Sequence, residues 1–107
     1  GLQIEGKRSI SKIVTGVTAC QALIEQAILL KADAIIVHHG FFWRGENPCL
    51  IQIKYQRIKK LIENNIALLA YHLPLDVHPQ WGNNVQLATR LNIPFQKTVS
   101  AGGTPNL

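Results

Sequence analysis

The residues of this 107-residue sequence best suited to chemistry are its histidines and one aspartate that lies among them. His38 and His39 are adjacent, and they end a short apolar run. His72 follows a second apolar run, and Asp76 comes four residues later. Imidazole nitrogens and carboxylate oxygens are the normal protein ligands of zinc, iron and manganese. The pattern therefore predicts a divalent-metal site with His38, His39 and Asp76 as ligands.

Two apolar segments must bring these side chains together. Residues 34–37 and 66–71 are apolar throughout, which is typical of strands whose two faces are both covered. The carboxyl ends of parallel strands meet at one edge of a sheet, and ligands bind beyond that edge. We therefore expect the metal site at the carboxyl ends of two neighbouring parallel strands.

The adjacent histidines require an unusual backbone if both are to bind metal. In a regular strand His38 and His39 point to opposite faces of the sheet. Gly40 follows them, and a glycine allows the chain to turn so that both rings face one crevice. Two metals about 3.5–4 Å apart could then bridge a water, lower its pKa and orient a polar substrate, which is hydrolytic chemistry. The pattern assigns no residue a catalytic role of its own.

The second segment offers further roles. His72 could be an additional ligand, could hold a ligand in place, or could move a proton. Pro74 disfavours a regular helix there, so His72 and Asp76 are expected to lie on a loop. His78 precedes Pro79 and is expected to position that loop.

Each of these features also has a simpler explanation. The histidines could be ordinary polar residues that close two strands. Asp33 is expected to be a turn residue. The aromatic cluster 41–43 could stack on a base or cover a pocket, and could equally belong to the core or to a subunit interface. Asn83 or Asn84 is expected to cap a helix.

Strands and helices are expected to alternate along the chain. Thr18 and Gln21 have the spacing of a capping box, which predicts that a helix begins there. The fold class is α/β, with a parallel or mostly parallel sheet and helices packed on its faces. One domain is expected over residues 1–99, followed by a flexible tail at 100–107. The other expected elements are strands at 2–4, 10–16 and 93–99, a helix at about 50–63 closed by Asn64 and Asn65, and a short helix beginning at Asn83 or Asn84.

Composition narrows the class of protein. Hydrophobic residues make up 47% and charged residues 16% of the chain, as in a globular domain, and no apolar run is long enough to span a membrane. The net charge of +5 would suit a phosphorylated small molecule or a nucleic acid, and a basic surface without a partner is equally compatible with it. Cys20 and Cys49 lack any metal or redox spacing, which favours free thiols in a reducing cytoplasm.

The predicted site is incomplete within this sequence. No histidine, cysteine, aspartate or glutamate follows His78. Two catalytic metals usually need about five or six protein ligands, with open positions for water. Either the site holds one metal, or the remaining ligands lie outside this sequence.

Several motifs together resemble the Nif-three-like family, whose members are labelled GTP cyclohydrolase 1 type 2 homologues. The resemblance covers nearly all of residues 1–95 and is close to the bacterial branch. The motifs are GLQIEG at 1–6, IVTGVTA at 13–19, ADAIIVHHGFFW at 32–43, YHLPLDVHP at 71–79 and GNN at 82–84.

The resemblance implies an α/β protein with two divalent metals and a hexameric ring of identical subunits. The family's paired histidines match His38 and His39, and its metal-binding aspartate matches Asp76. Its remaining histidine and glutamate ligands, and its N-terminal helix, have no counterpart here, which implies that the sequence is an internal fragment. The label implies that metal-activated water opens the imidazole ring of GTP with release of formate. The competing hypothesis is a non-enzymatic ring-forming or nucleic-acid-binding protein.

Overall fold

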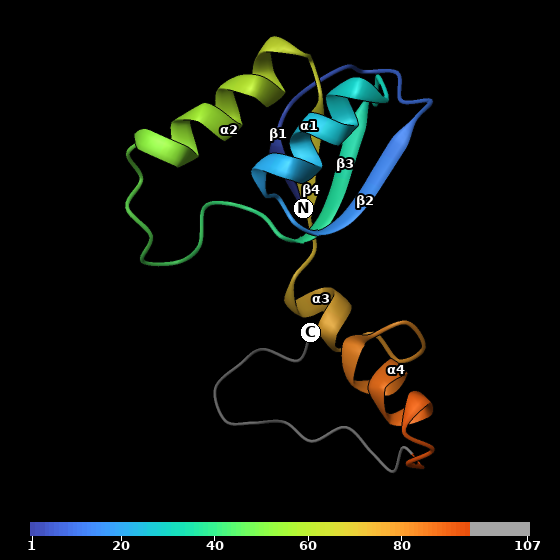
Figure 1. Ribbon diagram of the computed structural model, residues 1–107. Coiled ribbons are helices and arrows are strands. Elements are labelled where there is room, and N and C mark those ends of the chain that lie inside the picture. The colour runs from blue at the N-terminus through green and yellow to red at the C-terminus, as the bar shows by residue number, and fades with distance from the viewer. Residues whose placement is uncertain (95–107) are drawn as a thin grey trace. The chain divides into compact units, whose positions relative to one another are not determined.

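The computed structural model describes residues 1–94, which form two compact units (Figure 1). The first unit is Gly1–Tyr71, and the second begins at His72. The first contains a four-stranded sheet with helices and confirms the predicted α/β class. None of the helices in residues 1–94 combines the length and the apolar character needed to cross a bilayer.

The sheet of the first unit is mixed, so the predicted parallel or mostly parallel sheet was wrong. Its strand order is β1-β4-β3-β2. Strands β2, β3 and β4 run parallel, whereas β1 pairs antiparallel with β4. The elements of this unit are β1 (Leu2–Ile4), β2 (Ile13–Thr18), α1 (Gln21–Leu29), β3 (Ala34–His39), α2 (Gln52–Glu63) and β4 (Ala67–Ala70).

The direction of each strand follows from the segment that connects it to the next. A helix links β2 to β3 and another links β3 to β4, and such a crossover returns the chain to the same edge of the sheet. Residues 5–12, between β1 and β2, contain no helix. They run along the amino ends of β4 and β3, where the Lys7 N–H donates to the Asn65 carbonyl (3.1 Å). β1 therefore ends on the same side of the sheet as that on which β2 begins. Its direction is thus opposite to that of the other three strands.

Both helices pack on the same face of this sheet. The two crossovers step in one direction across the strand order, and right-handed crossovers then place their helices on one side. The largest completely buried side chains come from both helices, from β3, and from β4 and the residue before it; they are Ile24, Ile35, Leu61, Ile66 and Leu68. Burial of each such side chain contributes roughly 1.5–3 kcal/mol.

The opposite face of the sheet has no helix within this unit, although helices were expected on its faces. Leu2, Ile13 and Val17 are largely exposed there, and Ile36 and Leu69 are half-buried. The uniformly apolar sequences of β3 and β4 predicted strands that are covered on both faces, but only one face is covered by helices of this unit.

The start of α1 differs from the predicted capping box. Thr18 is the last residue of β2, and Cys20 is the residue that precedes the helix. No side chain caps the first turn. The expected strand 10–16 is likewise shifted to Ile13–Thr18. Ser11 cannot extend that strand because its backbone N–H donates to Asp33.

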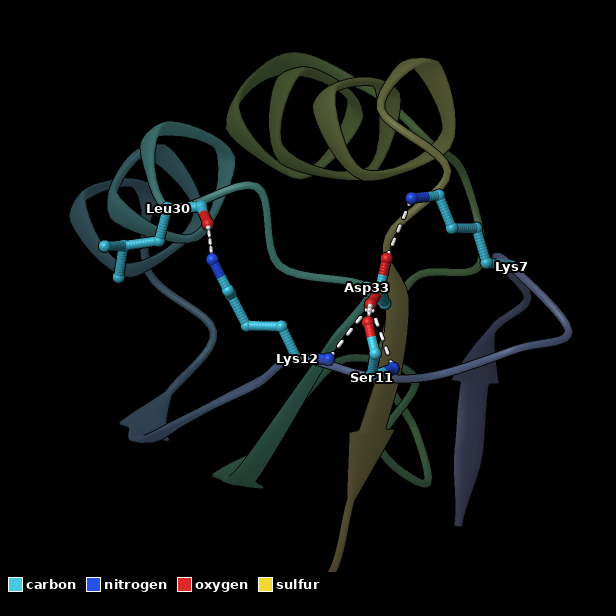
Figure 2. Close-up of polar contacts among 5 residues, drawn as sticks. All are labelled: Lys7, Ser11, Lys12, Leu30 and Asp33. Carbon is cyan, nitrogen blue, oxygen red and sulfur yellow. Dashed lines mark hydrogen bonds and ion pairs between the residues drawn. The ribbon is translucent and has the colours of Figure 1, made fainter.

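Asp33 binds the β1–β2 connection to the start of β3 (Figure 2). Its side chain is buried, and one carboxylate oxygen accepts from the Ser11 N–H (3.0 Å), the Ser11 hydroxyl (2.8 Å) and the Lys12 N–H (3.0 Å). The other oxygen accepts from Lys7 Nζ at 2.8 Å. Lys12 Nζ donates in turn to the carbonyl of Leu30, at the end of α1 (2.8 Å). Asp33 thus links the β1–β2 connection to the start of β3, and Lys12 extends this link to the end of α1. The sequence had predicted only a turn residue at this position.

The second unit contains α3 (Leu73–Asp76) and α4 (Asn83–Arg90). Pro74 lies within the first turn of α3, where its missing N–H removes no helical hydrogen bond. The expected loop between His72 and Asp76 was therefore wrong. Gly82, rather than Asn83 or Asn84, precedes α4. Residues 93–94 have no regular structure, and the rest of the expected strand 93–99, like the expected tail at 100–107, lies outside the described residues.

Replacement of Asp33 by asparagine is expected to destabilise the first unit. The Lys7 ammonium, followed by hydrogen bonds from Ser11 and Lys12, holds the pKa of Asp33 far below its usual range. Because this pKa is lower in the folded protein, the stabilisation is complete above about pH 4, the unfolded value, and is lost as the pH falls further. Asp33→Asn should therefore lower Tm by several degrees at pH 7, and the difference from wild type should narrow in acid.

The difference in Tm is measured by thermal melts followed by circular dichroism. The melts are recorded between pH 2 and pH 7, at pH values about one unit apart. Glu5→Gln is the matched control, since Glu5 is an exposed acid in the same connection. An Asp33→Asn variant that melts with wild type at pH 7 would contradict the role given to this carboxylate.

Candidate metal centre

The histidine pair lies at the end of β3, as the sequence predicts. Both rings are half-buried, and β3 continues as a strand through His39. The ring centroids of His38 and His39 are 4.5 Å apart, with an interplanar angle of 79°. The two imidazoles therefore contact each other in spite of the alternation expected along a strand.

Thr18 orients one of the two rings. In the parallel pairing of β2 and β3, Thr18 lies opposite His39. The Thr18 hydroxyl is 3.2 Å from His39 Nδ1, and the His39 carbonyl accepts from the Ala19 N–H (2.8 Å). A hydrogen bond at one ring nitrogen fixes the orientation of an imidazole, so Thr18 orients the His39 ring.

The chain immediately after the histidines is held by Gln3 of β1. The side-chain oxygen of Gln3 accepts from the Phe41 N–H (2.7 Å), and its amide nitrogen donates to the Phe41 carbonyl. A Cβ on Gly40 would lie 2.0 Å from this Gln3 oxygen and 2.7 Å from Cβ of Ala70. Gly40 is thus required for a close approach of the backbone, and no turn conformation has to be invoked.

The aromatic cluster 41–43 divides between core and surface. Phe41 is buried in the core, whereas Phe42 and Trp43 are 47% and 41% exposed. The Trp43 ring lies edge-to-face with His39, with centroids 6.5 Å apart. The sequence left open whether this cluster belongs to the core, and Phe41 does belong to it.

The loop that follows is anchored to α2. Glu46 accepts from the Phe42 N–H (2.8 Å) and forms an ion pair with Lys54 (3.0 Å). The Lys54 hydrogen bond holds the pKa of Glu46 below its usual value. Lys54 Nζ also lies 4.9 Å from the centroid of the Phe42 ring, which adds a cation–π contact. These contacts restrain the loop beside the histidine pair.

Strands β3 and β4 end at the same edge of the sheet. Val37 lies opposite Ala70, and the Tyr71 N–H donates to the Val37 carbonyl (3.0 Å). Tyr71 is the last residue of the first unit, and His72 is its covalent neighbour. The prediction that two apolar strands with histidines after them are parallel neighbours is therefore confirmed.

His72 and Asp76 form a helical pair within the second unit. His72 precedes α3 and Asp76 ends it. His72 Nδ1 is 3.4 Å from one Asp76 oxygen, and the Asn83 amide donates to the other (2.6 Å). His78 Nδ1 accepts from the backbone N–H groups of Gln80 (3.2 Å) and Trp81 (3.0 Å), so His78 positions its loop as expected.

Sequence reasoning missed the residues that hold the candidate ligands in place. Gln3 and Thr18 act from neighbouring strands, and no local pattern relates them to the histidines. Asn83 was interpreted only as a helix cap, yet its amide contacts Asp76. The only sequence feature that could have indicated this contact is the position of Asn83 in the motif GNN at 82–84.

Comparison with known proteins places this chain in a family. A family model described as Duf34/NIF3 (NGG1p interacting factor 3) matches residues 1–102. The chain belongs to the Duf34/NIF3 family. The resemblance found in the sequence motifs is therefore confirmed.

Two curated relatives carry the name GTP cyclohydrolase 1 type 2 homolog. The Pasteurella multocida protein is 62% identical over 102 residues, which are 95% of this chain and 41% of the relative. The Pseudomonas aeruginosa protein is 53% identical over 102 residues, or 95% of this chain and 40% of the relative. The chain thus spans about 40% of the length of these Duf34/NIF3 proteins.

Solved structures of relatives share the fold. Protein ybgI, described as of unknown function, matches with a TM-score of 0.83 and 58% identity over 85% of this chain and 37% of that one. A protein from Thermus thermophilus, TTHA1606, matches with a TM-score of 0.77 and 42% identity, over 85% of this chain and 37% of that one.

Gly40→Ala is expected to release the segment that follows the histidine pair. The new Cβ would collide with the Gln3 amide and with Ala70, so either Gln3 loses its bonds to Phe41 or the backbone moves. The expected cost is about 1–3 kcal/mol of stability. NMR spectra should show shifted signals for the Phe41 amide and the Trp43 indole.

Gly1→Ala is the matched control, because a Cβ at Gly1 has no heavy atom within 4 Å. It should leave both signals and the stability unchanged. Equal behaviour of the two variants would show that Gly40 is not needed for close packing.

Proposed function

We propose that this protein binds divalent metal at the carboxyl ends of β3 and β4 and that the metal site hydrolyses a nucleotide ring. The observation that supports this most directly is the contact between the His38 and His39 rings, 4.5 Å between centroids, at the end of a strand. Imidazole nitrogens are common metal ligands, and this contact brings two imidazole rings together.

The available donor set suits zinc, iron or manganese. His38 and His39 contribute imidazole nitrogens, and Asp76 contributes carboxylate oxygen, with His72 as a further ligand or as the residue that orients Asp76. Thr18 engages Nδ1 of His39, and Asn83 engages one oxygen of Asp76. Such hydrogen-bonded partners are the usual environment of metal-binding histidines and carboxylates.

When bound, the metal would supply Lewis-acid chemistry and a water of lowered pKa. The residues of the chain then have separate tasks. Thr18 keeps the His39 ring in one orientation, Gln3 holds the segment after Gly40, and Trp43 packs edge-to-face beside His39. His72, which lies beside Asp76, would orient this carboxylate or pass a proton.

The nature of the substrate rests on the relatives. Two relatives that share more than half of their aligned residues with this chain are named GTP cyclohydrolase 1 type 2 homolog, so we propose a purine nucleotide whose imidazole ring is opened. The same proposal includes a cytoplasmic location, assembly into a hexameric ring and a second metal ion in the site. Nucleic-acid binding stays a prediction from the net charge alone.

Metal binding is tested by titration of the chelator-treated protein with zinc and manganese, followed by metal analysis after dialysis. The wild type should retain metal, and His38→Ala, His39→Ala and Asp76→Ala should each lose it because each removes a donor atom. Thr18→Val should bind about 10–100-fold more weakly, since it removes only the hydrogen bond that orients His39.

Cys49→Ser is the control for adventitious binding, because Cys49 is an exposed free thiol. It should bind metal as the wild type does. A wild-type protein that takes up neither metal, or binding that disappears only with Cys49, would refute the metal centre. If metal binds but incubation with GTP releases no formate, the hydrolase part of the proposal fails for this chain, which spans about 40% of the length of its relatives, and the metal has a structural role in it.

A further inference from the structure

A cleft lies between α1 and α2, outside the candidate metal centre. Its volume is about 610 Å³, which is within the range of small-molecule sites. It shares no residue with the histidine pair or with its supporting side chains. Most of its lining surface is apolar, because long side chains expose their aliphatic parts there, and polar or charged groups lie among them. The lining residues are Gln21, Gln52, Ile53, Gln56, Arg57 and Lys60.

Arg57 supplies an uncompensated charge to this cleft. Its Nε atom is buried and has no hydrogen-bond partner among the described residues. A buried guanidinium N–H without an acceptor is costly, since arginine has only donors to offer and remains charged. Because Arg57 lines the cleft, its guanidinium is a group there that can donate to an acceptor of a ligand.

The other cation of the cleft is already neutralised. Lys60 Nζ forms an ion pair with Glu25 at 2.7 Å, and Gln21 donates to the same oxygen at 2.7 Å. The hydrogen bond from Lys60 lowers the pKa of Glu25 and keeps it ionised. The balance of these three charged groups is one positive charge, and it resides on Arg57.

Two helix amino ends add to the positive potential. Gln21 is the first residue of α1 and Gln52 is the first residue of α2, and both line the cleft. Neither helix has a side-chain cap or an acidic residue in its first turn. The first backbone N–H groups of a helix lack intrahelical partners and attract anions.

We propose that the cleft between α1 and α2 binds the phosphate group of a small molecule. Phosphate offers several acceptor oxygens around one centre, which suits the Arg57 fork together with amide donors from Gln52 and Gln56. The proposal is independent of the metal centre, since the cleft needs no metal and uses other side chains.

The test is a titration of the metal-free protein with inorganic phosphate at constant ionic strength, followed by NMR of the ¹⁵N-labelled chain. The Arg57 Nε–H signal and the amides of the first turns of α1 and α2 should shift together and saturate. Arg57→Gln should bind phosphate at least ~10-fold more weakly, because it removes a charge-assisted bond. Arg57→Lys, which keeps the charge but loses the fork, should fall between the two.

Lys59→Gln is the matched control, since Lys59 lies on the same helix, is exposed and does not line the cleft. It lowers the net charge equally and should change affinity by less than ~2-fold. Signals that do not saturate, or equal losses in Arg57→Gln and Lys59→Gln, would overturn the proposal in favour of diffuse attraction to a basic surface. A parallel titration with acetate separates phosphate from carboxylate, and tighter binding of acetate would also overturn it.

Discussion

The carboxylate of Asp33 is the interaction on which the arrangement of the first unit depends. It is 5% exposed and accepts four hydrogen bonds from Lys7, Ser11 and Lys12. These bonds hold the β1–β2 connection against the amino end of β3, so that β1 can occupy one edge of the sheet while β2 begins at the other. An apolar residue at this position would leave the Ser11 and Lys12 N–H groups without a partner in a crowded part of the molecule. Asp33 thus holds in place the helix-free connection between β1 and β2, and the apolar pattern of the strands does not encode this contact.

The same constraint acts on the opposite end of the sheet. Because β1 is held antiparallel to β4, Gln3 lies where it can bind the backbone of Phe41, directly after the histidine pair and Gly40. Thr18 reaches His39 because the β2–β3 register places them opposite each other. The side chains that orient the candidate ligands thus come from the two edge strands, and Asp33 holds the connection between these strands.

Sequence reasoning succeeded where a feature is local and strongly patterned. The apolar runs that became β3 and β4, the histidines after them, and the end of α2 at Asn64 are all visible over a few consecutive residues. It failed where a feature depends on distant partners. Asp33 bonds to residues more than twenty positions earlier, which no turn pattern reveals. The helix α3 was missed because Pro74 was weighed as a helix breaker, although proline in a first turn costs nothing.

The alternation of strands and helices explains why two different kinds of site can arise close to one edge of this unit. In a β-α-β crossover each helix begins on the side where the preceding strand ends, so the carboxyl end of β2 and the amino end of α1 are separated only by Ala19 and Cys20. Thr18, at that strand end, contacts a candidate metal ligand, whereas Gln21, at that helix start, lines the basic cleft. The strand ends offer side chains with lone electron pairs, and the helix starts offer N–H groups. The two proposed sites therefore differ in the groups that they offer, although both lie where strands end and helices begin.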